Sequence, residues 1–289
     1  MTLADAQVAA PAAAAPHIVD VLIAERAPRL AASAAWPLLR PLLYATLHYG
    51  DARRMADAVA PLPGRAAVDY VSGLLAVTVE ARGLERIPRD GACIVVCNHP
   101  TGIADGIAVY DALKAVRPDL VFYANADALR VSPRLGEILI PVEWVESKRT
   151  RDRTRLTLEM TRAAMEAGRC LVVFPAGRLA RRQPDGTLAD PPWAATPVSL
   201  CRKYGAPVVP IHVAGPNSRL FHLFHRFSPE LRDITLFHEM LNKRGRSFSL
   251  LVGPPIRTDA FQGAPAEAVE ALKAYVERVL PSDPDGAFA

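Results

Sequence analysis

A histidine and an aspartate stand close together in the segment VVCNHPTGIADG, which runs from Val95 to Gly106. An apolar run ends just before His99, and Asp105 follows after a turn that contains Gly102. A carboxylate that accepts a hydrogen bond from one imidazole nitrogen fixes the tautomer, so that the other nitrogen can take a proton. The spacing therefore indicates a general base, while an aspartate in the first turn of a helix also has a purely structural explanation.

The surrounding elements indicate how this pair would be held. From residue 76 onward, strand-like apolar runs alternate with helix-length segments, which predicts a largely parallel α/β sheet covered by helices on both faces. In such sheets, functional groups gather at the carboxyl ends of the strands. Two expected strands end in unusual sequences, 92–97 before CNHPTG and 170–174 at FPAGR. The other expected strands are 76–81, 120–124, 138–145, 207–215 and 248–256, and the expected helices are 103–116, 153–168, 193–205 and 264–280.

The chain divides by composition into four segments. Residues 1–15 form an Ala/Pro-rich stretch that we expect to be a disordered leader, and residues 281–289 are expected to be a disordered tail. Residues 16–64 suit several short helices, and 65–280 form the α/β domain. The aromatic residues from Trp36 to Tyr49 fit either a membrane interface or a helical layer packed on the sheet. No run of 18 apolar residues is free of charge, so no classical membrane span is expected.

Other chemistries find little support in the sequence. It contains no P-loop, dinucleotide-binding, nucleophile-elbow or HExxH motif. The cysteines lie in or beside apolar runs, which indicates buried thiols in a reducing compartment, and no metal site is expected. His212 falls in an expected strand and suits the core. The cysteines are Cys93, Cys97, Cys170 and Cys201, and the histidines of the loop-rich stretch after that strand are His222, His225 and His238.

Basic residues crowd the segment SKRTRDRTR at 147–155, and the net charge of the chain is +4. Such crowding suits an anionic partner, namely lipid headgroups, a phosphate-bearing substrate or an acidic carrier protein. A solvated helix entry explains it equally well.

Three blocks in order, NHPTGIADG, FPAGR and VVPIHVAG, resemble the lysophospholipid and glycerolipid acyltransferases, the family of 1-acylglycerol-3-phosphate acyltransferase. The resemblance covers about residues 75–255. The segment LNKRG followed by FSLLVGPPI is also similar to a branch with ornithine-lipid and haemolysin-like acyltransferases. The resemblance implies an enzyme that moves a fatty acyl group from an acyl thioester to a hydroxyl group.

Carried over residue by residue, the resemblance implies that His99 is the general base and that Asp105 orients it. It implies no metal, no cofactor and no covalent acyl-enzyme, with acyl carrier protein or coenzyme A bearing the acyl group as co-substrate. The residues that would form the acceptor site are Lys148, Arg149, Phe174, Pro175, Gly177 and Arg178.

Two departures from the family pattern bear on the acceptor. Five residues, rather than four, separate His99 from Asp105, and the extra one falls beside Gly102 in a turn that can absorb it. The usual Phe-Pro-Glu-Gly-Thr block reads Phe-Pro-Ala-Gly-Arg here, so Arg178 either binds a phosphate or carboxylate or pairs with an acidic neighbour.

We therefore expect a bacterial, cytoplasmic O-acyltransferase of lipid metabolism that associates peripherally with the membrane and acts on a lyso-lipid or related amphiphile. Its expected partners are membrane lipids and the thioester donor, with no nucleic acid. Two alternatives remain: a non-catalytic lipid-binding or scaffold protein of the same fold, and an acyl thioesterase that uses water as acceptor.

Overall fold

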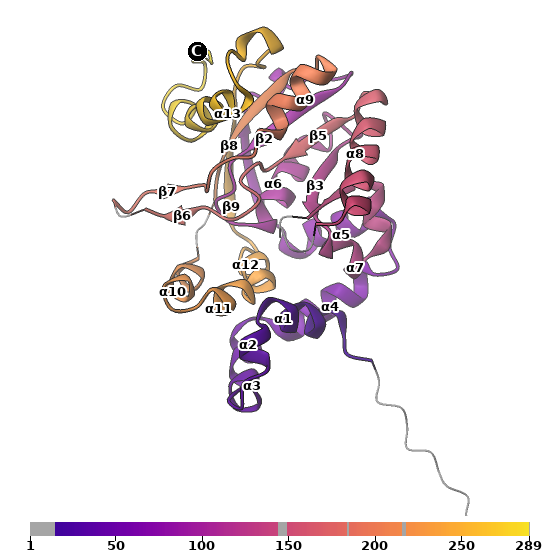
Figure 1. Cartoon of the computed structure of the whole chain (residues 1–289), viewed down its shortest axis with the longest axis vertical. Coiled ribbons are helices and arrows are strands. Elements are labelled where there is room, and N and C mark those ends of the chain that lie inside the picture. The colour runs from indigo at the N-terminus through magenta and orange to yellow at the C-terminus, as the bar shows by residue number, and fades with distance from the viewer. Residues whose placement is uncertain (1–14, 144–148, 184, 216–217, 289) are drawn as a thin grey trace, which may run out of the picture.

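A computed structural model describes residues 15–143, 149–183, 185–215 and 218–288 (Figure 1). A seven-stranded sheet crosses the molecule in the order β1-β9-β8-β2-β5-β3-β4. Five strands are parallel to one another, while β9 is antiparallel to β8, and β1 is parallel to β9. The expected largely parallel α/β sheet is thus confirmed. The strands are β1 (Thr78–Arg82), β2 (Cys93–Cys97), β3 (Val121–Asn125), β4 (Leu139–Val142), β5 (Cys170–Val173), β8 (Val208–Ala214) and β9 (Ser247–Val252).

Helices cover both faces of this sheet, and two very short strands, β6 (Arg181–Arg182) and β7 (Leu188–Ala189), form a separate hairpin. Helices α6, α8, α9 and α13 lie where the sequence pattern predicts helices. The helices are α1 (Ile18–Arg26), α2 (Pro28–Ala31), α3 (Trp36–Thr46), α4 (Tyr49–Val59), α5 (Gly64–Leu75), α6 (Ile103–Leu113), α7 (Asp127–Val131), α8 (Arg151–Glu166), α9 (Thr196–Tyr204), α10 (Arg219–Phe227), α11 (Pro229–Asp233), α12 (Leu236–Leu241) and α13 (Pro265–Ala274).

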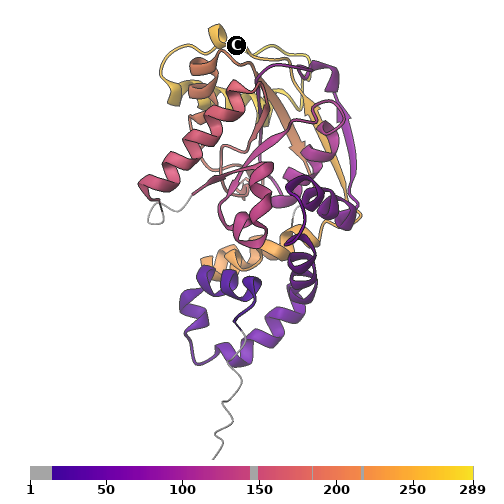
Figure 2. The same ribbon diagram turned by 90° about the vertical axis from the view of Figure 1, so that its right-hand side faces the viewer.

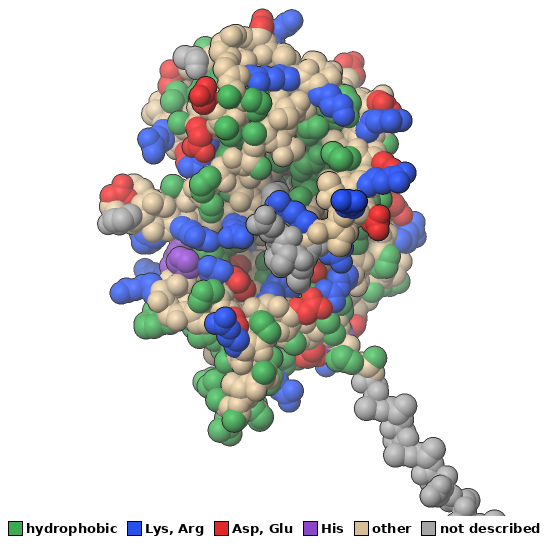
Figure 3. All heavy atoms as spheres, in the orientation of Figure 1, with side chains coloured by type: hydrophobic (Ala, Val, Ile, Leu, Met, Phe, Trp, Pro, Cys, Tyr) green, Lys and Arg blue, Asp and Glu red, His purple; other side chains and the backbone are tan. Residues whose placement is uncertain are grey.

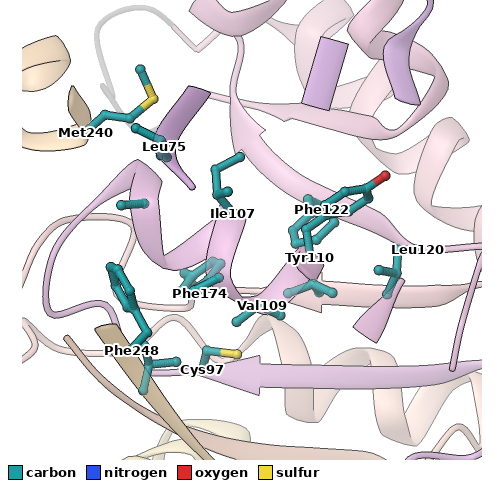
Figure 4. Close-up of a cluster of buried hydrophobic side chains, with 14 of the residues drawn as sticks. Leu75, Cys97, Ile107, Val109, Tyr110, Leu120, Phe122, Phe174, Met240 and Phe248 are labelled. Carbon is teal, nitrogen blue, oxygen red and sulfur yellow. The ribbon is translucent and has the colours of Figure 1, made fainter. Parts of the chain in front are cut away.

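The central strand β2 explains why the sheet needs cover on both sides. All five of its residues are buried, as is expected of a strand in a parallel sheet with two covered faces. Cys93, Val95 and Cys97 belong to one core, which includes side chains of α4 and α6, whereas Ile94 and Val96 belong to the other, with side chains of α8, α9 and α13. Figure 4 shows the first core, where Cys97, Val109, Phe174 and Phe248 gather beside β2. A strand held from both sides is a rigid support for the residues that follow it.

The N-terminal helices pack against helices that the sequence analysis did not predict. The stretch that carries His222, His225 and His238 was expected to be rich in loops, and this expectation was wrong, because the chain forms α10, α11 and α12 there. The hydroxyl groups of Ser218 and Ser228 cap α10 and α11. These helices lie beside α1–α4 in both views of the ribbon (Figures 1 and 2).

Two contacts join these groups of helices. The carboxylate of Glu230 accepts the backbone N–H groups of Arg29 and Leu30 at 3.2 and 2.8 Å. The Nδ1 atoms of His48 and His238 lie 2.9 Å apart.

The ends of the chain differ in what the structure shows. Residues 1–14 of the expected leader lie outside the described residues. The tail was expected to be disordered, but Phe288 instead packs on Phe261 and Tyr275, and the Tyr275 hydroxyl donates to the Gly286 carbonyl at 2.6 Å. Among the described residues, none of the helices combines the length and the apolar character needed to cross a bilayer.

Candidate active site

His99 stands just beyond the carboxyl end of β2, and its backbone is held from two directions. Its carbonyl accepts the N–H of Ala180 at 2.9 Å, and its own N–H donates to both carboxylate oxygens of Asp190 at 3.1 Å. The side chain is 16 % exposed. Because Ala180 and Asp190 belong to the chain that leaves β5, the His99 backbone is tied to the neighbouring strand's loop as well as to its own strand.

Asp105 occupies the first turn of α6, where the sequence analysis placed it, and its side chain is completely buried. Its carboxylate lies 3.0 Å from Nδ1 of His99. It also accepts the N–H of Thr101 at 2.9 Å, the Thr101 hydroxyl at 2.6 Å and the N–H of Gly102 at 3.0 Å. Four hydrogen bonds therefore fix the position of this carboxylate relative to the imidazole.

The turn between the two residues depends on Gly102. This residue has a φ of +96°, which disfavours any side chain, and a Cβ atom placed there would lie 3.2 Å from the side chain of Leu179. The glycine therefore allows the backbone to reverse and lets Leu179 pack against the turn. The longer spacing between His99 and Asp105 is accommodated here.

The contact to Asp105 indicates that Nδ1 of His99 carries a proton, because a carboxylate only accepts hydrogen bonds. In the neutral ring with Nδ1–H donating to Asp105, Nε2 carries the lone pair, and it has no hydrogen-bond partner among the described residues. An imidazole in this state can remove a proton from a hydroxyl group that approaches Nε2. Cys97 lies close by, but burial and the carboxylates of Asp105 and Asp190 raise the pKa of its thiol. A thiol in that environment is a poor nucleophile.

Asp190 is a site residue that sequence reasoning missed. Its carboxylate accepts the indole N–H of Trp193 at 2.9 Å in addition to the N–H of His99, and its own N–H donates to Glu277 at 2.7 Å. Burial raises the pKa of Asp190 to about 7. No local pattern joins it to a residue 91 positions earlier, and the sequence signal is limited to an aspartate three residues before the tryptophan of DPPW.

One of the expected acceptor-site residues, Phe174, lies against His99, and two others belong to the turn that follows it. Phe174 follows β5, the neighbour of β2 in the sheet, and its ring centroid is 4.6 Å from that of His99. The N–H of Gly177 donates to the Phe174 carbonyl at 3.0 Å, closing a turn in which Gly177 has a φ of +60°. Pro175 is buried in that turn, and its carbonyl accepts the N–H of Ala194 at 3.0 Å. The FPAG block thus forms a compact turn beside the imidazole.

Arg178 follows this turn and is exposed, two residues before the alanine that bonds to His99. Among the described residues it has no carboxylate partner. Arg178 and Arg232 both contribute to the lowered pKa of Arg181, whose main cause is burial, while Asp233, the ion-pair partner of Arg232, acts in the opposite direction. Figure 3 shows basic and histidine side chains gathered over β6 and α10 in the left half of that face. This cationic surface adjoins the site.

Of the remaining two expected residues, Lys148 lies outside the described residues. Arg149 stands just before α8 and donates from Nε to the carbonyl of Glu143 at 3.1 Å. The preceding strand β4 is three strand positions from β2, which corresponds to about 14 Å at the usual strand spacing. Among the described residues, no group of three or more His, Cys, Asp or Glu side chains is arranged to hold a metal ion.

Comparison with known proteins gives consistent matches. The family model described as Acyltransferase matches residues 78–214. The lyso-glycine lipid O-acyltransferase of Phocaeicola vulgatus is 30% identical over 223 residues, which cover 73% of this chain and 78% of that protein. The protein of the same name from Bacteroides thetaiotaomicron is 28% identical over 223 residues, covering 73% and 80%.

A solved structure also matches over most of the chain. It is the 1-acyl-sn-glycerophosphate (LPA) acyltransferase PlsC from Thermotoga maritima, with a TM-score of 0.47 and 15% identity, covering 92% of this chain and 96% of that one.

Proposed function

This chain belongs to the acyltransferase family, and we propose that it transfers a fatty acyl group from a thioester to the hydroxyl group of a lyso-lipid. The observation that carries the proposal is the contact between His99 and Asp105, whose carboxylate is buried and held by Thr101 and Gly102. The two curated relatives, named for O-acylation of a lyso-glycine lipid, support a lyso-lipid acceptor. The acyl donor in the proposal is acyl carrier protein or coenzyme A.

The reaction follows from the free nitrogen of the imidazole. The acceptor hydroxyl donates its proton to Nε2 of His99 while its oxygen attacks the thioester carbonyl carbon. Asp105 holds Nδ1–H and stabilises the imidazolium that forms. The tetrahedral intermediate then collapses, the carbon–sulfur bond breaks, and the thiolate takes the proton from Nε2. The ester and the free thiol leave, so the histidine returns to its starting state.

The guanidinium groups beside the site suit the headgroup of the acceptor. Arg178 is exposed and has no carboxylate partner among the described residues, and Arg181 is partly buried next to it. Guanidinium groups bind carboxylate and phosphate through paired N–H donors. We therefore propose that the anionic headgroup binds at Arg178 and Arg181, which flank the segment whose Ala180 bonds to the His99 backbone.

Exposed leucines on α3 support peripheral membrane association. Leu38 is 83% exposed and Leu42 64%, and neither is accounted for by packing within the described chain. Hydrophobic side chains gather at the bottom of the molecule in Figure 3, where Figure 1 places α3 in the same orientation. Apolar side chains on a surface helix can enter the headgroup boundary of a bilayer. We propose that α3 rests in the cytoplasmic leaflet and so gives the site access to its lipid acceptor.

The deciding experiment is a transfer assay with purified protein. Palmitoyl-coenzyme A and palmitoyl carrier protein are each supplied with lyso-glycine lipid, lyso-ornithine lipid or lysophosphatidic acid, and products are identified by mass spectrometry. Acylated lipid that depends on His99 is expected. Free fatty acid without acylated lipid would show a thioesterase instead, and lipid binding without turnover would show a non-catalytic protein.

A further inference from the structure

Helix α8 carries a regular stripe of basic residues on its outer face. Arg151, Arg155, Leu158 and Arg162 follow one another at intervals of four, three and four residues, so they share one side of the helix. Thr161, Ala164 and Met165 point to the sheet and are buried. The stripe spans twelve residues, or about 16 Å along the helix axis. It is therefore long enough to lie along a second helix.

This stripe forms one wall of an open groove. Arg149 and Thr150 close one end, Lys203 of α9 contributes from the other side, and the volume is about 610 Å³. Five cations line the groove against a single carboxylate, that of Glu159. Leu158 lies among these cations and is 61% exposed. The groove thus combines strong positive charge with an accessible apolar side chain.

The cations of the groove are available to an incoming partner. Among the described residues, Arg151 and Lys203 pair with no carboxylate. Within the described part of the chain, Arg149 donates to a backbone carbonyl, that of Glu143, and to no carboxylate. Arg155 and Arg162 do pair, with Glu159 and Glu166, but these are exposed pairs along the same helix, which contribute little. Binding an acidic partner would therefore break no strong interaction.

Arg149 and Thr150, which line the groove, follow β4, three strand positions from β2. The N-terminus of α8 follows β4, and β4 is parallel to β2, so both strands end at the same edge of the sheet. Three strand spacings separate them, or about 14 Å. If the body of a carrier protein stays on the groove, its acyl group must cross these strands to reach His99. The long, flexible arm of a pantetheine-bound thioester suits such a span.

We propose that the α8–α9 groove is the docking site of an acidic, helical acyl carrier protein, with Arg151, Arg155 and Arg162 facing its carboxylates and Leu158 contacting an apolar residue between them. The proposal rests on the acyl transfer proposed above and names its donor. The length of the stripe and the exposed leucine favour a protein helix over the small phosphate groups of coenzyme A. A groove recognises a bound helix through charged and apolar contacts that repeat at helical spacing.

Direct binding tests the proposal without any need for turnover. Fluorescently labelled acyl carrier protein, loaded with a palmitoyl group, is titrated with the enzyme at low ionic strength and its anisotropy is followed. Arg151→Glu and Leu158→Asp are each expected to raise Kd by about tenfold. Arg151→Glu should fold normally, because a carboxylate in the first turn of a helix is favourable. The matched control is Arg89→Glu, an equal charge change at an exposed position just before β2, on the opposite edge of the sheet.

The outcomes separate this proposal from that of acyl transfer. No binding of the carrier protein by the wild type, or an equal loss in Arg89→Glu and Arg151→Glu, would overturn the docking site. If transfer occurred from palmitoyl-coenzyme A but not from palmitoyl carrier protein, the docking site would also be overturned, while the proposed acyl transfer would stand. Selective loss in Arg151→Glu and Leu158→Asp, without transfer to any lyso-lipid, would keep the docking site and reject the proposed function.

Discussion

The Nδ1 atom of His99 and the Oδ2 atom of Asp105 lie 3.0 Å apart, although the two residues belong to different elements. His99 follows β2, and Asp105 belongs to the first turn of α6. The same carboxylate oxygen accepts the N–H groups of Thr101 and Gly102, so it is held in place whether or not the imidazole is present. The pair can therefore be dissected by substitution.

Replacing the imidazole tests the proposed base. His99→Ala is expected to lower kcat by roughly 10²–10⁴-fold, the usual contribution of a positioned proton acceptor. Its thermal unfolding should stay close to that of the wild type, because the His99 backbone contacts remain. Steady-state kinetics and calorimetry measure the two quantities. Near-normal transfer by a folded His99→Ala protein would reject the assignment.

Replacing the carboxylate tests the orientation of the ring. Asp105→Asn is expected to reduce kcat because an amide can present its NH₂ group to Nδ1 and so favour the wrong tautomer. The same amide would face the N–H groups of Thr101 and Gly102, so the melting temperature should fall as well. The control is Asp111→Asn, a substitution on the same helix whose carboxylate accepts from Ser72 and Lys114. If Asp105→Asn kept full activity, the imidazole would need no such partner.

Arg178 is expected to contribute to binding of the acceptor but not to binding of the thioester. Arg178→Ala should raise the KM of the lyso-lipid about tenfold or more while the KM of the thioester changes little. Arg178→Lys should restore the loss only in part, because an ammonium group lacks the paired donors of guanidinium. Arg182→Ala is a suitable control, since Arg182 is an exposed neighbour that donates to the Gly186 carbonyl. Equal changes in both KM values would place Arg178 outside the headgroup site.

The raised pKa of Asp190 predicts a pH dependence of stability. Its carboxyl group binds a proton up to about pH 7 in the folded protein but only up to about pH 4 when unfolded. The stability that this group contributes is therefore complete below pH 4 and declines as the pH rises through 7. Between pH 5 and 8 the unfolding free energy of the wild type should fall more than that of Asp190→Asn, by about 1 kcal/mol or more. Urea titrations of both proteins at pH 5 and pH 8 measure this difference. An equal change of unfolding free energy with pH in the two proteins would contradict the prediction.

The exposed leucines of α3 predict salt-resistant membrane binding. Leu42→Asp should remove most of the co-sedimentation with anionic vesicles that persists at high salt, where charge attraction is screened. Leu188→Asp, an exposed leucine of the β6–β7 hairpin, is the control. Deleting residues 1–60 would be a poorer test, because Val19, Leu22 and Met55 belong to the core. A wild-type protein that stays in the supernatant under every condition would reject membrane association.

Local sequence patterns predicted the parts of the fold that repeat along the chain. The buried strand before His99, the helix that carries Asp105 and the turn at Phe174 all follow from apolar runs and glycine positions. The turn at Gly102 required only a residue that tolerates positive φ, which the sequence displays directly.

Features that depend on distant contacts could not be predicted in this way. Asp190 acts on His99 across 91 residues, and the buried Arg117 joins Asp119 to the carbonyl groups of Pro88, Gly91 and Gly168. Helices α10–α12 are short, and Pro229 and their serine caps resemble loop signals. Their stability comes from packing on α2 and α4, which no local pattern records.

The packing of α3 on α4, of α4 on α12 and of α12 on α6 has a consequence for acceptor choice. If α3 sits in the bilayer, this row of helices sets how high above the lipid surface α6 and its Asp105 stand, and His99 stands with them. A lyso-lipid whose hydroxyl lies near its acyl chain would have to rise partly out of the bilayer. A lyso-lipid whose hydroxyl lies farther from the acyl chain, toward the end of the headgroup, would not. The enzyme would then select acceptors by the height of the hydroxyl above the bilayer as well as by the charge of the headgroup, because the row of helices fixes the distance between the bilayer and His99.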